Sequence, residues 1–224
     1  MPPLKAGACK TVIRHSDWFR CADRCIYRVL MIRYIQSNKS VFGGKKMCLD
    51  ELRSNIAIKQ KKGLPFICAS IIIWLLILIV ILLDLPQNTE NLLVLCCSCP
   101  LLPISWAIGK ILKVDIFDKS NPLGNVGFLF TCNQFLYLLI VMWVFNAVPD
   151  KMVMVYAMVF GAHLLPYSWL YKSISYRIFA IIIPVLSLVI GCIFSALFIA
   201  LTLILVECIF AAALFAELGR FTNK

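Results

Sequence analysis

The stretch PFICASIIIWLLILIVILL, residues 65–83, contains nineteen residues and no charge. At the α-helical rise of about 1.5 Å per residue, it is long enough to cross the roughly 30 Å hydrocarbon core of a bilayer. Its apolar run exceeds the ~7–15 residues of a cleaved signal peptide, and the DLPQNTEN segment that follows offers no small-residue cleavage site. The stretch therefore predicts a transmembrane helix.

The composition of the whole chain agrees with a lipid environment. Hydrophobic residues make up 62% of the 224 residues, and charged residues only 15%. A water-soluble domain of this size has too small an interior to hide so much apolar surface, which excludes the soluble globular classes. The chain has eleven cysteines, but most of them lie in apolar runs, where cysteine behaves as a small hydrophobe, so no disulfide framework is predicted.

Further apolar segments of membrane-spanning length follow at residues 92–111, 126–147 and 152–171. The first of these holds Pro100 and Pro103, which predict a kinked or partly unwound helix. An apolar tract then covers residues 178–216; as one helix it would be about 60 Å long, twice the bilayer core, so it must fold back, and we expect the turn at residues 191–195. The sequence thus predicts an all-α bundle of six transmembrane helices.

Basic residues concentrate in every second segment outside these spans. Lys59, Lys61 and Lys62 precede the first span, three lysines fill the loop between the second and third, and the loop after the first span has two acids and no base. Cytoplasmic segments carry the excess of Lys and Arg in membrane proteins. The pattern therefore predicts that both termini are cytoplasmic.

The segment before residue 48 allows two interpretations. Residues 43–47, GGKKM, back-translate to a purine-rich tract and a start codon, as in a bacterial ribosome-binding site, so residues 1–46 are interpreted as a translated upstream region. The rival interpretation is a basic amphipathic arm, because Arg20, Arg24 and Arg28 recur at four-residue spacing. After it we expect a cytoplasmic surface helix within residues 47–64, the six-helix domain within residues 65–218, and a cytoplasmic tail at residues 219–224.

Few side chains in the predicted spans are costly to place in lipid, and they gather near one depth. Glu207 lies near the centre of the sixth span, His163 about midway along the fourth, and Asn133 and Gln134 about eight residues into the third. Tyr167 follows His163 by four residues, so the two share a helix face. Ionisable groups and carboxamides at the level of a broken helix predict a midplane site for a small solute or a proton relay.

Each of these residues also has a purely structural interpretation. Glu207 could be a protonated hydrogen-bond donor between helices, and His163 a structural donor. Asn133 and Gln134 could be polar contacts between packed helices.

The sequence offers little support for an enzyme. It has no phosphate-binding glycine loop, no HExxH and no GxSxG. Cys96, Cys97 and Cys99 could ligate a soft metal, but no second cluster matches them, and no spacing pairs a cysteine with His163 as a thiol nucleophile. We predict neither metal nor cofactor. The net charge of +11 comes mostly from residues 1–46, so we predict no nucleic-acid partner.

Three segments carry a resemblance to a known family: KQKKGLPFI, NPLGNVGFLFTCNQFLYLLIVMWVF and VPDKMVMVYAMVFGAHLLPYSWLYKS. Over residues 49–220 the chain resembles a family of small bacterial integral-membrane proteins, a domain of unknown function. The resemblance implies a bacterial plasma membrane and a start near Met47, and it implies no activity.

Two function classes follow, and each predicts different partners. The first is a carrier of a small solute or ion that uses the midplane site. The alternative is a non-transporting accessory or regulatory protein, which binds another membrane protein or a second copy of itself through its helices. An intramembrane hydrolase is a third and weaker interpretation.

Overall fold

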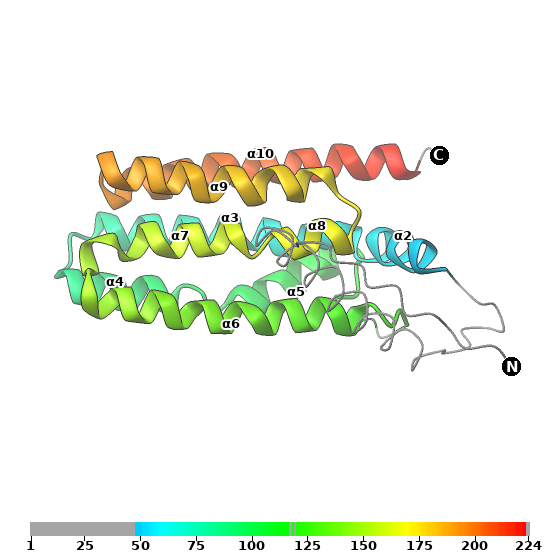
Figure 1. Cartoon of the computed structure of the whole chain (residues 1–224), viewed down its shortest axis with the longest axis horizontal. Coiled ribbons are helices and arrows are strands. Elements are labelled where there is room, and N and C mark those ends of the chain that lie inside the picture. The colour runs from blue at the N-terminus through cyan, green and yellow to red at the C-terminus, as the bar shows by residue number, and fades with distance from the viewer. Residues whose placement is uncertain (1–47, 117, 119, 223–224) are drawn as a thin grey trace, which may run out of the picture. The chain divides into compact units, whose positions relative to one another are not determined.

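The computed structural model describes residues 48–116, 118 and 120–222, and this part contains helices and no strand. The interpretations of residues 1–46 lie outside the described residues. Figure 1 shows the helices in chain order. They are α2 (Leu49–Lys59), η1 (Lys61–Gly63), α3 (Leu64–Leu82), α4 (Gln87–Cys96), α5 (Leu101–Ile111), α6 (Gly124–Ala147), η2 (Pro149–Lys151), α7 (Met152–Ala162), α8 (Leu165–Leu170), α9 (Ile174–Ile193) and α10 (Ala196–Thr222).

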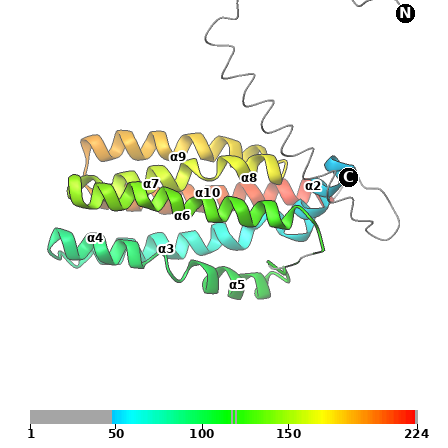
Figure 2. The same ribbon diagram turned by 60° about the horizontal axis from the view of Figure 1, so that its bottom comes forward.

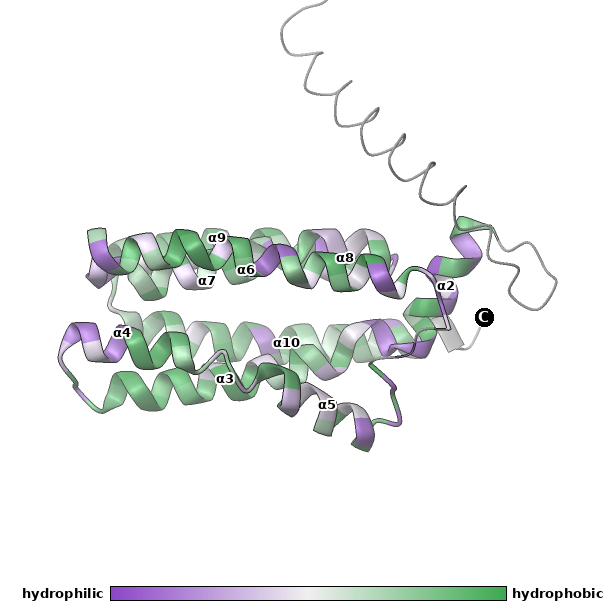
Figure 3. Cartoon of the chain, turned by 90° about the horizontal axis from the view of Figure 1, so that it is seen from below, coloured by the Kyte–Doolittle hydropathy of each residue, from purple (hydrophilic) through white to green (hydrophobic). Residues whose placement is uncertain are grey.

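Six segments of the described chain are long and apolar enough to cross a membrane, which confirms the predicted all-α bundle of six spans. They are Lys61–Leu82, Gln87–Ile111, Gly124–Ala147, Pro149–Leu170, Ile174–Ile193 and Ala196–Arg220. Hydrophobic residues dominate the middle of the helices, and hydrophilic residues gather mostly toward their ends and on α2 (Figure 3). The chain is therefore a multi-pass membrane protein.

The buried centre of the bundle is formed by four helices. Helix α3 packs along α10, α7 packs along α9, and α9 also packs against α10. Ile77, Ala157, Ile183 and Leu203, one from each helix, are almost completely buried there. Helices α4 and α5 lie against α3, and α6 lies against α7 and α8 (Figures 1 and 2). We call the end of the bundle that carries α2 and the last turns of α10 the α2 end.

The second span is interrupted where the prolines predict it. Helix α4 ends at Cys96 and α5 begins at Leu101, and the four residues between them form turns. Pro100 has no N–H to donate to the carbonyl four residues earlier, so the helical ladder cannot continue. Short turns replace it, with the amides of Ser98 and Cys99 bonded to the carbonyls of Leu95 and Cys96 at 3.1 and 3.0 Å.

The fourth span, predicted over residues 152–171, is interrupted as well. Helix α7 ends at Ala162 and α8 begins at Leu165. Pro166 is the physical cause, because it cannot donate to the carbonyl of Ala162. His163 therefore lies at a break between two helices.

The turn between the fifth and sixth spans is shorter than predicted. Helix α9 continues through Gly191 to Ile193, and only Phe194 and Ser195 separate it from α10. Gly191 instead allows α7 and α9 to approach closely, since a Cβ on it would lie 2.4 Å from Cγ of Met154. Small residues at such contacts are typical of packed membrane helices.

Gly161 is a second position where α7 and α9 approach closely. A Cβ added there would lie 2.5 Å from Cδ of Pro184 and 2.6 Å from Cγ2 of Ile183, and neither a proline ring nor a β-branched side chain can move aside easily. We expect Gly161→Leu to destabilise the protein by about 3 kcal/mol or more, at the upper end of overpacking effects. The measurement is SDS-induced unfolding in mixed micelles, followed by circular dichroism.

Gly219 supplies the matched control for this substitution. It lies in α10 with nothing within 4 Å of an added Cβ, so Gly219→Leu should leave the unfolding midpoint nearly unchanged. Equal midpoints for the two variants would contradict the close α7–α9 contact.

Candidate functional site

Glu207 of α10 and Ser70 of α3 form a buried polar contact between two membrane-spanning helices. The exposed fraction is 0% for Glu207 and 3% for Ser70. Oε2 of Glu207 is within hydrogen-bond distance of Oγ of Ser70. The long α3–α10 contact positions the pair, with Ser70 roughly one third of the way along α3.

The hydrogen bonds around Ser70 favour a protonated Glu207. Oγ of Ser70 also lies 2.7 Å from the carbonyl oxygen of Ile67. A hydroxyl carries one proton, so it can donate fully to only one of these two oxygens. Both contacts are satisfied together when the Glu207 carboxyl donates to Ser70 and Ser70 donates to Ile67.

The second carboxyl oxygen of Glu207 is less well satisfied. Oε1 is buried and has no hydrogen-bond partner among the described residues. Buried polar atoms without a partner are rare in native proteins, and an ionised carboxylate without one is far more costly than a neutral acid. Oε1 is therefore available to a ligand that can donate a hydrogen bond or carries positive charge.

His163 lies in a second region, at the break between α7 and α8. Its ring centroid is 5.4 Å from that of Phe160 and 6.2 Å from that of Tyr167, as expected for residues three and four positions apart. Nδ1 is buried and makes no hydrogen bond of good geometry among the described residues. The backbone carbonyls of Val159 and Phe160, in the preceding turn, interact with the imidazole.

Tyr167 fixes how α8 meets α6. Its hydroxyl is 2.9 Å from Oγ1 of Thr131, which also donates to the carbonyl of Gly127 at 3.1 Å. The spans that contain Thr131 and Tyr167 run antiparallel. Gln134, three residues after Thr131, and His163, four residues before Tyr167, therefore lie at a similar depth in the membrane. No hydrogen bond is formed between them in the described structure.

Asn133 and Gln134 point about 100° apart around α6, because they are consecutive residues of a helix. Gln134 falls on the stripe that contains the buried Val141, which faces α7 and α8, whereas Asn133 falls on the stripe of the exposed Leu129 and Leu136. Neither carboxamide has a hydrogen-bond partner in the described part of the chain. The five predicted residues thus divide between an α3–α10 contact, an α6–α8 contact and a half-buried position of α6 beside the exposed Leu129 and Leu136.

Aromatic side chains bridge the two inner regions. The ring of Tyr176 in α9 lies 6.1 Å from that of Tyr167 and 4.9 Å from that of Phe210, centroid to centroid. Phe210 follows Glu207 by three residues and so lies on the same side of α10.

Ser70 and Thr131 are the partners that the sequence interpretation missed. Both are small hydroxyl residues, which are common in membrane helices and do not stand out by charge. Ser70 is nevertheless the only hydroxyl-bearing residue of α3, so plotting hydroxyls by depth beside Glu207 would have revealed it. A third such pair joins Ser98, in the break of the second span, to the Tyr156 hydroxyl at 2.7 Å.

A buried ion pair lies at the α2 end. Nζ of Lys62 is 2.9 Å from Oε1 of Glu217, and the Lys62 side chain is completely buried. Glu217 also accepts a hydrogen bond from Ser173 at 2.7 Å, and the Tyr176 hydroxyl donates to the Lys62 carbonyl at 2.9 Å. These contacts tie the start of α3 to the end of α10 and to the start of α9.

The backbone around Lys62 is strained. Lys61, Lys62 and Gly63 have φ values of 44°, 51° and 70°, so three consecutive residues adopt a left-handed conformation. That conformation costs roughly 1–2 kcal/mol for each non-glycine residue. Gly63 is required sterically, because a Cβ there would lie 2.9 Å from the Tyr176 hydroxyl. The ion pair and hydrogen bonds must offset this strain.

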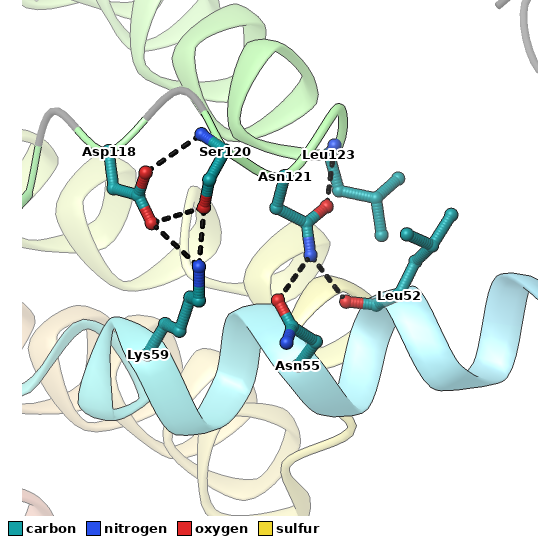
Figure 4. Close-up of polar contacts among 7 residues, drawn as sticks. All are labelled: Leu52, Asn55, Lys59, Asp118, Ser120, Asn121 and Leu123. Carbon is teal, nitrogen blue, oxygen red and sulfur yellow. Dashed lines mark hydrogen bonds and ion pairs between the residues drawn. The ribbon is translucent and has the colours of Figure 1, made fainter. Parts of the chain in front are cut away.

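Helix α2 is fastened to the loop before α6 by the contacts drawn in Figure 4. Nδ2 of Asn121 donates to the carbonyl of Leu52 at 2.8 Å and to Oδ1 of Asn55 at 3.1 Å. Nζ of Lys59 is 3.3 Å from Oδ2 of Asp118. On another side of α2, the guanidinium of Arg53 donates to the Trp169 carbonyl and lies 4.7 Å from the Trp169 ring centroid.

The Asp118 contact predicts a pH effect on this loop. Hydrogen bonds from Ser120, first from its side chain and then from its amide, together with Lys59, hold the pKa of Asp118 below its ordinary value. The contribution to loop anchoring is therefore present above the unfolded-state pKa and lost as the pH falls through the folded-state pKa. We expect amide hydrogen exchange in residues 112–123 to accelerate in acid, after correction for the intrinsic rate.

Asp118→Asn provides the control for this pH effect. The variant should show faster exchange in the same loop at neutral pH and no further acid-induced change. If the wild-type loop keeps its protection through the acid range, Asp118 does not anchor it.

No group of three or more His, Cys, Asp or Glu side chains in the described part of the chain gathers closely enough to hold a metal ion. Cys96 and Cys99 are exposed and Cys97 is half-buried, all as free thiols.

Comparison with known proteins adds a family and no activity. The model of a family of unknown function, DUF7010, matches residues 49–217. The match confirms the resemblance to an uncharacterised family found in the sequence. No curated protein and no solved structure matches the chain.

Proposed function

Because the chain belongs to the DUF7010 family, whose function is unknown, we propose from its geometry that it is a membrane carrier that exchanges a proton for a small monovalent cation. The observation that carries this proposal is the carboxyl of Glu207, which is fully buried in a membrane-spanning helix with one oxygen beside Ser70 and the other without a partner. Ionisable residues at such positions commonly serve substrate or proton pathways.

The hydrogen-bond arrangement supports competition between proton and cargo. Oγ of Ser70 contacts both Oε2 of Glu207 and the Ile67 carbonyl. In the protonated form, the Glu207 carboxyl can donate to Ser70, and the Ser70 proton is then free for Ile67. When the carboxyl releases its proton, Ser70 cannot stabilise both the carboxylate and the Ile67 carbonyl with one hydroxyl proton. The ionised Glu207 then requires a compensating cation, so a cationic cargo takes the position that the proton leaves.

The exchange conserves charge at the site. The carboxylic acid and a monovalent cation become a carboxylate–cation pair and a free proton, and the reverse step releases the cargo. A buried carboxylate is thus never left without a compensating charge, which keeps the barrier to crossing the membrane low.

The breaks in the second and fourth spans support the movement that a carrier needs. Both occur within membrane-spanning segments, and discontinuous helices are common at transporter binding sites. His163 and Tyr167 lie at the second of these breaks, and we assign them to the mobile wall of the pathway. Gln134 on α6 faces them.

The charge pattern supports a location and an orientation for this carrier. The α2 end carries Lys59, Lys61, Lys62 and Lys113. Residues 84–91, which follow α3, carry two acids and no base. By the positive-inside rule, we assign the α2 end and the C terminus to the cytoplasm of a bacterial plasma membrane. The alternative class is a non-transporting accessory protein. It predicts that no added solute changes the rate of proton movement across the membrane of vesicles that contain the protein.

Vesicles containing only the purified protein test the proposal. They are loaded at acid pH with a pH-sensitive dye, and Li⁺, Na⁺, K⁺ and a series of small organic ammonium ions are added outside in turn. We expect at least one of these cations to raise the internal pH faster than in protein-free vesicles. The same rates with and without protein for the whole series, in both directions of the gradient, would overturn the proposal.

A further inference from the structure

One face of α6 carries a regular exposed stripe. Leu129, Asn133, Leu136, Ile140 and Trp143 recur at alternating spacings of four and three residues, which is the seam pattern of a helix that packs against another helix. The four apolar members are 50–67% exposed, so no other described element covers them. Helix α6 runs along one edge of the bundle (Figure 1). We call this stripe the α6 seam.

Asn133 distinguishes the α6 seam from an ordinary lipid-facing surface. Its carboxamide is half-buried and makes no hydrogen bond in the described part of the chain, although it lies within a membrane-spanning segment. Lipid tails offer no donor or acceptor, so a carboxamide facing them remains unsatisfied. A polar group brought to the seam by a second helix would satisfy it.

A second copy of the chain would supply a polar partner for Asn133. Two copies of a membrane protein inserted with one orientation are related by a two-fold axis along the membrane normal, so their α6 helices run parallel. In a parallel pair, each core position meets the same position of the other helix. An amide has both a donor and an acceptor, so Asn133 is complementary to a second Asn133.

The neighbouring residues fit the same arrangement. Asn133 and Ile140 fall at the a positions, and Leu129, Leu136 and Trp143 at the d positions. Between residues 129 and 140 the seam has β-branched Ile at a and Leu at d, the combination that favours two strands. A single Asn at an a position fixes register and oligomeric state. From these observations, we infer that the protein forms a parallel homodimer through the α6 seam, with Asn133 hydrogen-bonded to its counterpart. This inference is independent of the proposed exchange activity.

Dimer formation is measured on the full-length protein, with one fluorophore per copy, by counting photobleaching steps in bilayers at decreasing protein-to-lipid ratios. We expect wild-type protein to show two-step traces and Asn133→Leu to require about tenfold more protein per lipid for the same dimer fraction, as expected for one interhelical hydrogen bond. Gln134→Leu removes the adjacent carboxamide, which faces the bundle, and should leave the dimer fraction unchanged.

A second measurement locates the contact without depending on Asn133. Ile140→Cys on the seam and Met142→Cys, which is 54% exposed but lies on another side of α6, are compared by oxidation in membranes and mass spectrometry of linked peptides. The seam predicts an intermolecular disulfide at residue 140 and none at residue 142. Single-step traces for wild-type protein at every ratio, or linkage at residue 142 instead of 140, would overturn the inference.

Discussion

Glu207→Gln is expected to reduce cation-dependent proton movement to the rate of protein-free vesicles while leaving the bundle folded. Glutamine has nearly the shape of the protonated acid, and its amide can donate to the Ser70 hydroxyl as a protonated carboxyl would. It cannot release a proton, so it cannot accept a cation in exchange. The measurement is the change of internal pH in vesicles, with circular dichroism to confirm that the protein is folded.

Glu90→Gln is the matched control, because it makes the same chemical change at a half-buried position in the first turn of α4, outside the predicted midplane site. Its exchange rate should equal that of the wild type. Ser70→Ala should retain exchange with a shifted pH dependence, since it removes the hydroxyl partner and keeps the titrating group. Coupled exchange by Glu207→Gln at the wild-type rate would remove Glu207 from the mechanism.

The largest expected effect on stability comes from the Lys62–Glu217 ion pair. Glu217→Leu leaves the ammonium of a completely buried Lys62 without its carboxylate, and breaking a buried pair in this way costs about 3–5 kcal/mol. The loss is amplified by the left-handed turn at residues 61–63, which the pair helps to hold. SDS-induced unfolding in mixed micelles measures the effect.

The exposed Lys59–Asp118 pair serves as the reference for this experiment. Asp118→Asn should cost at most about 1 kcal/mol, because solvent screens a pair of exposed side chains. The double variant Lys62→Met with Glu217→Leu should recover part of the stability lost by Glu217→Leu alone, since it removes the unpaired buried charge. Equal effects of Glu217→Leu and Asp118→Asn would show that the pair does not stabilise the α2 end.

The fold could be predicted because lipid imposes a simple rule on the sequence. An apolar run of about twenty residues must form a helix, and a tract of about forty must turn back, so residues 65–83 and 178–216 fixed three of the six spans. Pro100 predicted the break in the second span, because a missing N–H has a local consequence. Pro166 has the same local consequence in the fourth span, which breaks between α7 and α8.

The site could be predicted only in part, because depth can be read from a sequence and rotation about a helix axis is harder to assign. Glu207, His163, Asn133 and Gln134 were placed at one depth, yet their side chains face three different directions in the structure. Gln134 and Asn133 illustrate the difference, since one position along α6 changes the direction by about 100°. Ser70 was missed because its partner is distant in the sequence and its hydroxyl carries no charge.

The protonation of Glu207 is the point on which the proposed exchange depends, and infrared spectroscopy of the protein in lipid measures it without knowledge of the cargo. The difference spectrum between wild type and Glu207→Gln at neutral pH should contain the C=O stretch of a buried carboxylic acid, which disappears in the presence of a transported cation. A difference spectrum that contains only carboxylate bands, unchanged across the cations tested, would contradict a proton held between Glu207 and Ser70.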